Sequence, residues 1–447
     1  MARRWVNSLS YTRTIALSFF CVILIGSILL CLPISSRNGE WTPFLNALFT
    51  ATSATCVTGL VVYDTFTYWS LFGQLVILLM IQIGGIGLMT IITTFAIFRK
   101  KKIGLHERML LKASAGNTRL SGMVRLVKRI ILGTFIFEGI GAIFLAIRFI
   151  PQMGWLKGVY YAVFHAISSF CNAGFDLMGC YEQFSSFTAY ETDILVNVVV
   201  MLLIIIGGIG FLVWSDVIVH RGNFRNYSLH SKIVLMTTAF LLISGCLGFF
   251  LFERNGNLKG MSTFDQILSA MFMSVTTRTA GYNTMDLSTL SESGSLLAMI
   301  LMLIGGSPGS TAGGIKTTTF AAVVLTVWSM SKGSSELTIF KKRFEQNTAK
   351  QAMSIMAVYF AGVLLATMII CAIEPFSIKQ VLFETISAAG TVGLTQGITT
   401  SLGTVSRIIL IILMYGGRIG GMSLLLVFAE RKKEAPMKRP SEQVLLG

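Results

Sequence analysis

Four short segments with a glycine at matched positions are the residues of this chain best suited to chemistry. They are Val57, Thr58, Gly59 and Leu60; Asn172, Ala173, Gly174 and Phe175; Thr279, Ala280, Gly281 and Tyr282; and Thr391, Val392, Gly393 and Leu394. Successive glycines lie 115, 107 and 112 residues apart, so we infer four diverged copies of one unit. Such segments suit the binding of a dehydrated cation by rings of backbone carbonyl oxygens.

The fourth segment carries the strongest signal, because Thr391, Val392 and Gly393 read like a potassium selectivity filter. Successive carbonyls can point toward one axis only if the backbone alternates between left- and right-handed regions, and glycine reaches positive φ without a Cβ clash. The alternative is that the glycines allow tight turns or close helix packing. Their matched offsets favour a filter with K⁺ bound at these segments only. Their unequal side chains predict imperfect discrimination between K⁺ and Na⁺.

Each segment follows a short amphipathic run that must position it. The runs cover 44–53, 160–169, 264–275 and 378–387, and each is too short to cross a bilayer. Non-helical backbone at membrane depth is tolerated only where it is buried in protein or lines water, so we expect re-entrant pore helices. A large apolar residue ten positions before each glycine is expected to wedge the pore helix against its neighbours: Phe49, Phe164, Met271 and Phe383.

Composition places the chain in a membrane, because 53% of its residues are hydrophobic and only 13% are charged. Eight apolar stretches are candidate spans: 14–32, 71–98, 130–147, 194–213, 233–252, 296–304, 352–373 and 408–428. The first is long enough to be a span rather than a cleavable signal peptide. We predict an all-α membrane protein with eight transmembrane helices and four re-entrant pore helices around one pseudo-four-fold pore. Its four tandem repeats of span, pore helix, filter and span are 14–98, 125–220, 231–330 and 349–428.

Membrane topology explains the net charge of +16 better than a nucleic-acid partner does. Of the 36 Lys and Arg residues, 26 fall in segments that eight spans would place on one side. The positive-inside rule therefore predicts a multi-pass plasma-membrane protein with both termini in the cytosol. The basic segments 99–129, 221–232 and 332–350 are open to three interpretations: docking of an acidic partner, contact with membrane lipid, or plain solvation.

A second series of glycine clusters lies in the span after each filter, at 84–87, 207–210, 305–309 and 416–420. Glycine lowers helix propensity by about 1 kcal/mol per residue and permits both kinks and close contacts. A hinge and tight packing both remain open as their role.

The third copy contains a stretch that cannot form a continuous helix. It consists of Gly305, Gly306, Ser307, Pro308, Gly309, Ser310, Thr311, Ala312, Gly313, Gly314, Ile315, Lys316 and Thr317. We expect a flexible loop below the filter, and Ile315 breaks the residue order that a phosphate-binding loop would need. Arg418 is a charge in the middle of the last span, which marks it as functional. We expect the loop and Arg418 to form a gate; an ion pair between Arg418 and Glu138 is the alternative.

Other chemistries have weaker support. The seven cysteines and four histidines show no metal-ligand spacing, so no zinc site and no organic cofactor is expected. His165 and Ser168 share a helix face without a third catalytic group, so the protein is predicted not to be an enzyme. Arg278 is expected to point behind the filter toward Asp265 or Glu384. A secondary cation transporter with a midplane site is the alternative function, although the repeats of such proteins are usually inverted.

Over 14–428 the chain resembles the Trk/Ktr/HKT superfamily of cation transporters. The shared features are four repeats of span, pore helix, Gly-centred filter and span, a broken inner helix in the third repeat and an arginine in the inner helix of the fourth. Because the segment before its first span is short, the chain is most similar to the membrane (translocating) subunit of bacterial Ktr-type potassium uptake systems. The resemblance implies K⁺ uptake, a homodimer with one pore per protomer, and a regulatory cytosolic nucleotide-binding ring subunit. It also implies Na⁺ as an activator.

Overall fold

The computed structural model describes residues 11–87, 90, 123–333, 338–340, 342–344 and 347–420. The basic stretches 99–122 and 431–439, and the ends of the first and fourth expected repeats, lie outside these residues. The secondary structure of these residues is almost all helix, with one antiparallel hairpin of β1 (Thr338–Ile339) and β2 (Lys342–Arg343), in which Thr338 pairs with Arg343.

Three kinds of helix recur along the chain. The long helices are α2 (Tyr11–Cys31), α8 (Met123–Met153), α12 (Leu229–Glu253) and α16 (Thr348–Ile373). The short helices that follow them are α3 (Phe44–Cys56), α9 (Trp155–Phe170), α13 (Thr263–Thr276) and α17 (Ile378–Gly390). The inner helices come next: α5 (Leu71–Ile86), α10 (Ile194–Ile209), α14 (Glu292–Leu303) and α18 (Thr404–Ile419).

Smaller elements connect these helices. They are α4 (Thr65–Tyr68), α11 (Phe211–His220), α15 (Thr317–Ser331) and the 3₁₀ turns η1 (Pro33–Ser35), η2 (Met178–Cys180), η3 (Thr188–Tyr190), η4 (Phe224–Asn226) and η5 (Thr399–Ser401).

Four of the described helices, α2, α8, α12 and α16, are long and apolar enough to cross a bilayer, and α10 with α11 adds a fifth span if this pair, bent by 94°, counts as one. Helices α5, α14 and α15 are apolar but shorter, with 16, 12 and 15 residues. Large apolar side chains on the long helices are exposed, for example Ile143 (65%) and Phe240 (66%). The chain is therefore a helical membrane protein whose long helices present apolar side chains to lipid.

The inner helices break at their glycine clusters more often than the sequence predicted. Only the third was expected to be broken, yet α5, α10 and α18 also end there, at Gly87 (φ 88°), Gly210 (φ 102°) and Gly420 (φ 91°). The expected span 194–213 is therefore interrupted at Gly210, whereas the expected spans 71–98 and 408–428 extend beyond the described residues. Residues other than glycine rarely adopt such φ values, so these glycines permit the backbone to leave the helix.

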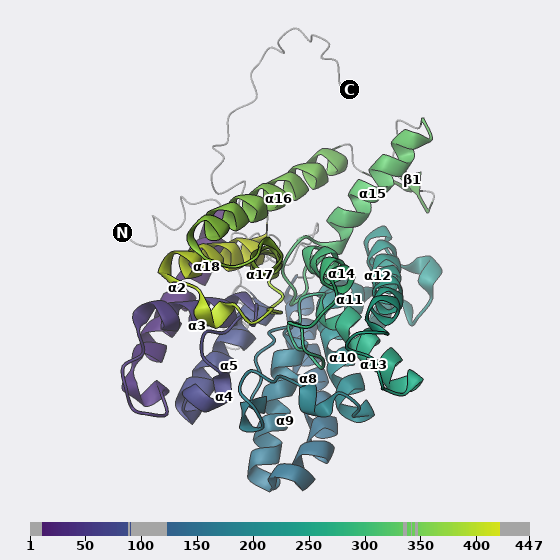
Figure 1. Cartoon of the computed structure of the whole chain (residues 1–447). Helices are drawn as coiled ribbons and strands as arrows, with labels where there is room; N and C mark the ends of the chain where they lie inside the picture. The colour runs from purple at the N-terminus through teal and green to yellow at the C-terminus, as the bar shows by residue number, and fades with distance from the viewer. Residues whose placement is uncertain are drawn as a thin grey trace, which may run out of the picture.

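The short helices pack in chain order around one centre. Each contacts the inner helix of the preceding unit: α9 contacts α5, α13 contacts α10, α17 contacts α14, and α3 contacts α18. In Figure 1 the purple, blue, green and yellow parts of the chain accordingly follow one another around the middle of the molecule. Phe49, Phe164 and Phe383 are fully buried, whereas Met271 is partly buried. The four short helices thus form the core that the long helices surround.

Candidate functional site

The four Gly segments meet in a closed ring at the centre of the short helices. A Cβ atom built on Gly59 would lie 2.7 Å from the carbonyl oxygen of Ala173 and 3.1 Å from the Cα atom of Gly174. Gly174 has the same relation to Ala280 and Gly281, at 2.6 and 3.2 Å. The contacts continue from Gly281 to Gly393, and from Gly393 back to Gly59. A side chain at any of these four glycines would therefore overlap the backbone of the next segment.

The backbone of every segment alternates in handedness. The glycines have φ values of 92° (Gly59), 70° (Gly174), 83° (Gly281) and 95° (Gly393). The first residues also have positive φ: 58° (Val57), 59° (Asn172), 83° (Thr279) and 52° (Thr391). The sequence predicted this conformation for the glycines only. A β-branched residue such as Val57 is rarely found at positive φ, so the packed surroundings must impose it.

Hydroxyl groups near the ends of the short helices hold the segments in place. The N–H groups of Gly59 and Gly393 donate to Ser53 Oγ and Ser387 Oγ, both at 3.0 Å. In the other two units, Ser168 Oγ donates to the Phe175 carbonyl at 2.7 Å, and Thr276 Oγ1 donates to the Tyr282 carbonyl at 2.6 Å. Sequence reasoning missed these residues, although a serine stands six positions before the glycine in three of the four copies.

The short helices end directly at the segments. Their C-terminal caps are Val57, Cys171, Thr277 and Thr391. A helix C-terminus carries a partial negative charge of about −0.5. Four such ends and the segment carbonyls meet at one place, so the electrostatics there favour a cation. No group of three His, Cys, Asp or Glu side chains able to hold a metal occurs within the described residues.

Arg278 makes no ion pair with Asp265 or Glu384, so its expected pairing with these two residues is wrong. Its Nη2 donates to the Gly305 carbonyl at 3.4 Å, at the start of the 305–317 loop. Asp265 instead accepts a hydrogen bond from Ser262, and Glu384 accepts one from Thr399.

His165 and Ser168 do not form a catalytic pair. His165 Nδ1 lies 2.7 Å from the Tyr161 carbonyl oxygen, to which it must donate, so Nε2 is left to accept from the Leu177 N–H at 3.1 Å. The Ser168 hydroxyl is bound to the Phe175 carbonyl. Both side chains hold backbone near the ring.

The loop 305–317 lies against the fourth segment. A Cβ atom on Gly314 would be 2.9 Å from the Gly390 carbonyl oxygen, and one on Gly313 would overlap the Thr391 side chain.

Neighbouring backbone anchors this loop, which the sequence predicted to be flexible. The Ser307 N–H donates to the Gly208 carbonyl at 3.0 Å, and the Phe211 N–H donates to the Gly309 carbonyl at 2.8 Å. Thr311 Oγ1 donates to the Phe170 carbonyl at 3.1 Å. Groups that a broken membrane helix leaves without partners are thus satisfied by the second unit.

Arg418 and Lys316 both donate hydrogen bonds to main-chain carbonyl oxygens of the 305–317 loop. Arg418 donates through Nη1 to Thr311 and through Nη2 to Gly84, so it joins the loop to the end of α5. Lys316 Nζ donates to the Ala312 carbonyl at 2.8 Å. Glu138 instead accepts from the Gln82 amide at 3.1 Å. The alternative ion pair between Arg418 and Glu138 is therefore absent.

The second series of glycines allows three inner helices to approach the ends of the short helices. A Cβ atom on Gly84 would overlap the carbonyl of Thr55, one on Gly207 that of Phe170, and one on Gly417 that of Ala389. Tight packing therefore explains these positions, while Gly87, Gly210 and Gly420 in the same clusters end the helices.

Known proteins resemble this chain over almost its whole length. The model of the TrkH family, described as a cation transport protein, matches residues 11–437. The potassium/sodium uptake protein NtpJ of Enterococcus hirae is 42% identical over 455 aligned positions, which cover 100% of this chain and 99% of that protein. The Ktr system potassium uptake protein B of Bacillus subtilis is 38% identical, with coverage of 99% and 98%. The crystal structure of the potassium transporter TrkH from Vibrio parahaemolyticus has a TM-score of 0.73 over 94% of this chain and 86% of that chain, at 16% identity.

Proposed function

Because the chain belongs to the TrkH family of cation transport proteins, we propose that it carries K⁺ into the cell as the membrane subunit of a Ktr-type uptake system. It is an ion transporter of the membrane and not an enzyme. Two relatives that match over their full length are named as potassium uptake proteins, which supports K⁺ as the substrate. The observation that carries the proposal is the closed ring of Gly segments.

The ring is the proposed selectivity filter. K⁺ sheds its water in a pore only where oxygen atoms replace the hydration shell. Alternating φ values and the converging ends of α3, α9, α13 and α17 supply such oxygens and a negative potential. In this proposal each repeat consists of a long span, a re-entrant pore helix and an inner span broken at its glycines. The boundaries proposed for the repeats are 14–98, 125–220, 231–330 and 349–428.

The 305–317 loop and Arg418 are the proposed gate. Arg418 is tied to backbone from two units, so movement of the loop away from α5 must break the hydrogen bond to Gly84 or that to Thr311. A positive charge beneath a cation filter raises the barrier to K⁺ while these bonds last. A regulatory cytosolic ring subunit would open the gate by favouring the state in which these hydrogen bonds are broken.

The remaining parts of the proposal concern the assembly. They are a homodimer, a nucleotide-binding ring subunit docked on basic segments such as 221–232, Na⁺ as an activator, and both termini in the cytosol. A relative named as part of a Ktr system supports the regulatory subunit.

The direct test is uptake of radiolabelled rubidium into liposomes that contain the purified protein. Wild type is compared with Gly281→Ser, with deletion of 310–313 and with Gly362→Ser. Gly362 is the matched control, because no atom lies within 4 Å of a Cβ built there. We expect saturable uptake that Na⁺ inhibits poorly in wild type and in Gly362→Ser.

The filter predicts that Gly281→Ser loses discrimination against Na⁺, and the gate predicts that the deletion raises uptake. Folded variants that all match wild type would contradict both assignments. Uptake driven by a counter-ion gradient, with Na⁺ exchanged in fixed proportion, would instead indicate a secondary transporter.

A further inference from the structure

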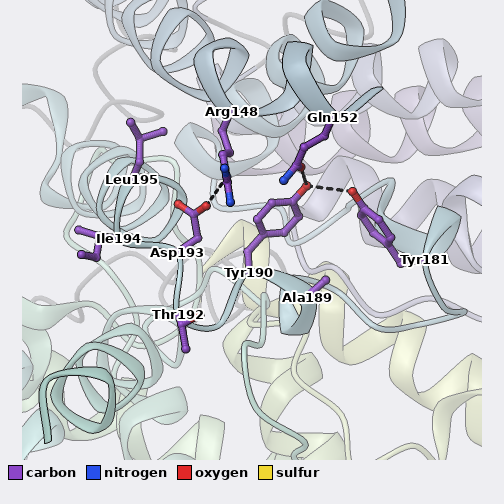
Figure 2. Close-up of a pocket in the computed structure, with 9 residues that line it drawn as sticks. All are labelled: Arg148, Gln152, Tyr181, Ala189, Tyr190, Thr192, Asp193, Ile194 and Leu195. Carbon is purple, nitrogen blue, oxygen red and sulfur yellow. Dashed lines mark hydrogen bonds and ion pairs between the residues drawn. The ribbon is translucent and has the colours of Figure 1, made fainter. Parts of the chain in front are cut away.

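A polar cavity of about 540 Å³ opens where the end of α8, the η3 turn and the start of α10 meet. Figure 2 shows Arg148, Gln152, Tyr181, Tyr190 and Asp193 around it. None of these residues belongs to the ring or to the 305–317 loop, so the proposed ion path does not account for the cavity.

The acceptor groups of this cavity are already occupied. Arg148 Nε lies 2.5 Å from Asp193 Oδ2, and Asp193 Oδ1 accepts from the Val196 N–H at 3.1 Å. The Tyr190 hydroxyl donates to Gln152 Oε1 at 2.5 Å, so it must accept from the Tyr181 hydroxyl, which lies 3.1 Å away. The side-chain oxygens of Asp193 and Gln152 that face the cavity thus each already pair with a donor.

Donor groups, in contrast, remain available. Arg148 is bound only through Nε, so its two terminal amino groups donate to no residue in the described part of the chain, and its side chain is 50% exposed. The Gln152 amide nitrogen is likewise without an acceptor among the described residues, because its Oε1 takes the hydrogen bond from Tyr190. Ile194 and Leu195, in the first turn of α10, also line the cavity, and first-turn amides have no partner within the helix. A fixed guanidinium fork beside such amides matches the oxygens of a phosphate.

Two helices that pack together and meet at the cavity, α8 and α10, carry exposed apolar side chains, which we call the apolar stripe. Its exposed side chains are Ile143 (65%) and Ile147 (57%) on α8, and Ile194 (54%) and Leu202 (52%) on α10. A molecule with a phosphate at one end and alkyl chains at the other would accept hydrogen bonds from the donors in the cavity and cover the apolar stripe.

We propose that this cavity binds the phosphate group of a membrane phospholipid, with Arg148 and Gln152 as donors and the lipid tails on the stripe. A water-soluble phosphate ester shares the headgroup chemistry, but it leaves the stripe uncovered. This assignment does not rest on the proposed filter or gate.

The test is native mass spectrometry of the full-length, delipidated protein in a neutral detergent. Phosphatidylglycerol and, separately, glycerol 3-phosphate are titrated into four proteins: wild type, Arg148→Gln with Asp193→Asn, Gln152→Leu, and Arg254→Gln. The double variant removes both charges together, so no unpaired carboxylate is left, and Gln152→Leu leaves the ion pair intact. Arg254 is the matched control, because it is an exposed arginine at the end of another long helix, α12.

We expect phosphatidylglycerol to bind about tenfold more weakly to the double variant, because a charge-assisted bidentate contact is lost. Gln152→Leu is expected to weaken binding about fivefold through loss of a neutral donor. Arg254→Gln should bind as wild type does. If glycerol 3-phosphate binds as tightly as the lipid, the cavity is a phosphate site for a soluble ligand and the lipid assignment is wrong. Lipid binding unchanged in both cavity variants, or weakened equally by Arg254→Gln, would overturn the proposal.

Discussion

The guanidinium of Arg418 donates a hydrogen bond to the main-chain carbonyl of Gly84, which lies 334 residues earlier in the chain. The same guanidinium donates to Thr311 in the loop of the third unit. One side chain of the fourth unit thus joins the first and third units below the ring.

Removal of this charge should open the path. We expect Arg418→Gln to raise rubidium uptake into proteoliposomes about tenfold, which corresponds to about 1.4 kcal/mol of barrier. Arg418→Lys keeps the charge and is expected to stay near wild type. Uptake that is unchanged in Arg418→Gln would show that the arginine holds the units together without limiting flux.

The close contact between Gly417 and the Ala389 carbonyl predicts a large difference between two glycine substitutions. Gly417→Ala should lower the free energy of unfolding by about 1–3 kcal/mol, because the added methyl group overlaps backbone. Gly362→Ala meets open space in the middle of α16 and should be neutral or stabilising by up to about 1 kcal/mol. Thermal unfolding followed by tryptophan fluorescence measures both, and equal midpoints would contradict the contact.

The hydroxyl of Thr276 should matter for selectivity more than for stability. Thr276→Val keeps the side-chain shape but loses the hydrogen bond to the Tyr282 carbonyl. Thr326→Val is the control, because Thr326 makes a bond of the same length, 2.6 Å, to Ala322 in α15. Each change should cost about 1 kcal/mol of stability. Only Thr276→Val should let Na⁺ compete better against rubidium uptake, and identical competition curves would argue against a supporting role behind the filter.

Asp176 should give uptake a pH dependence. It lies outside the helices, directly after the second Gly segment. Burial raises the pKa of its carboxyl to about 7, and the nearby charge of Asp64 adds to the rise, whereas the hydrogen bond from the Met178 N–H opposes it. The group therefore changes from mostly neutral to mostly negative as the pH rises through about 7.

A negative charge beside the ring concentrates cations there. Rubidium uptake at a subsaturating concentration should thus increase from pH 6 to pH 8. Asp176→Asn should remain at the low level throughout, and Asp286→Asn, at an exposed loop position, should behave as wild type. A pH profile that survives in Asp176→Asn would assign the titration to another group.

Sequence reasoning reached the features that each copy repeats locally. The offsets of Gly59, Gly174, Gly281 and Gly393 predicted a common conformation, and all four glycines have the positive φ that this required. The four amphipathic runs predicted the short helices, because a run that leads into a small-residue segment in every copy is visible without knowledge of contacts.

Features that depend on contacts between copies were missed. The positive φ of Val57 opposes its own preference and results from packing around it. The anchoring of the 305–317 loop depends on Gly208 and Phe211, about a hundred residues earlier. Arg278 was assigned a carboxylate partner by charge alone, whereas the structure supplies the carbonyl of Gly305.

The packing of α18 against α3 has a consequence for how the protein is made. Since α3 is synthesised long before α18, the first unit lacks its contact with the fourth unit until α18 has been made. A chain interrupted before Thr404 would lack α18, so the circle of helices around the ring would be incomplete on one side. The backbone of its Gly segments would then be open to lipid, where unpaired polar groups cost several kcal/mol each. Closure of the ring therefore requires the fourth unit to be in place against the first.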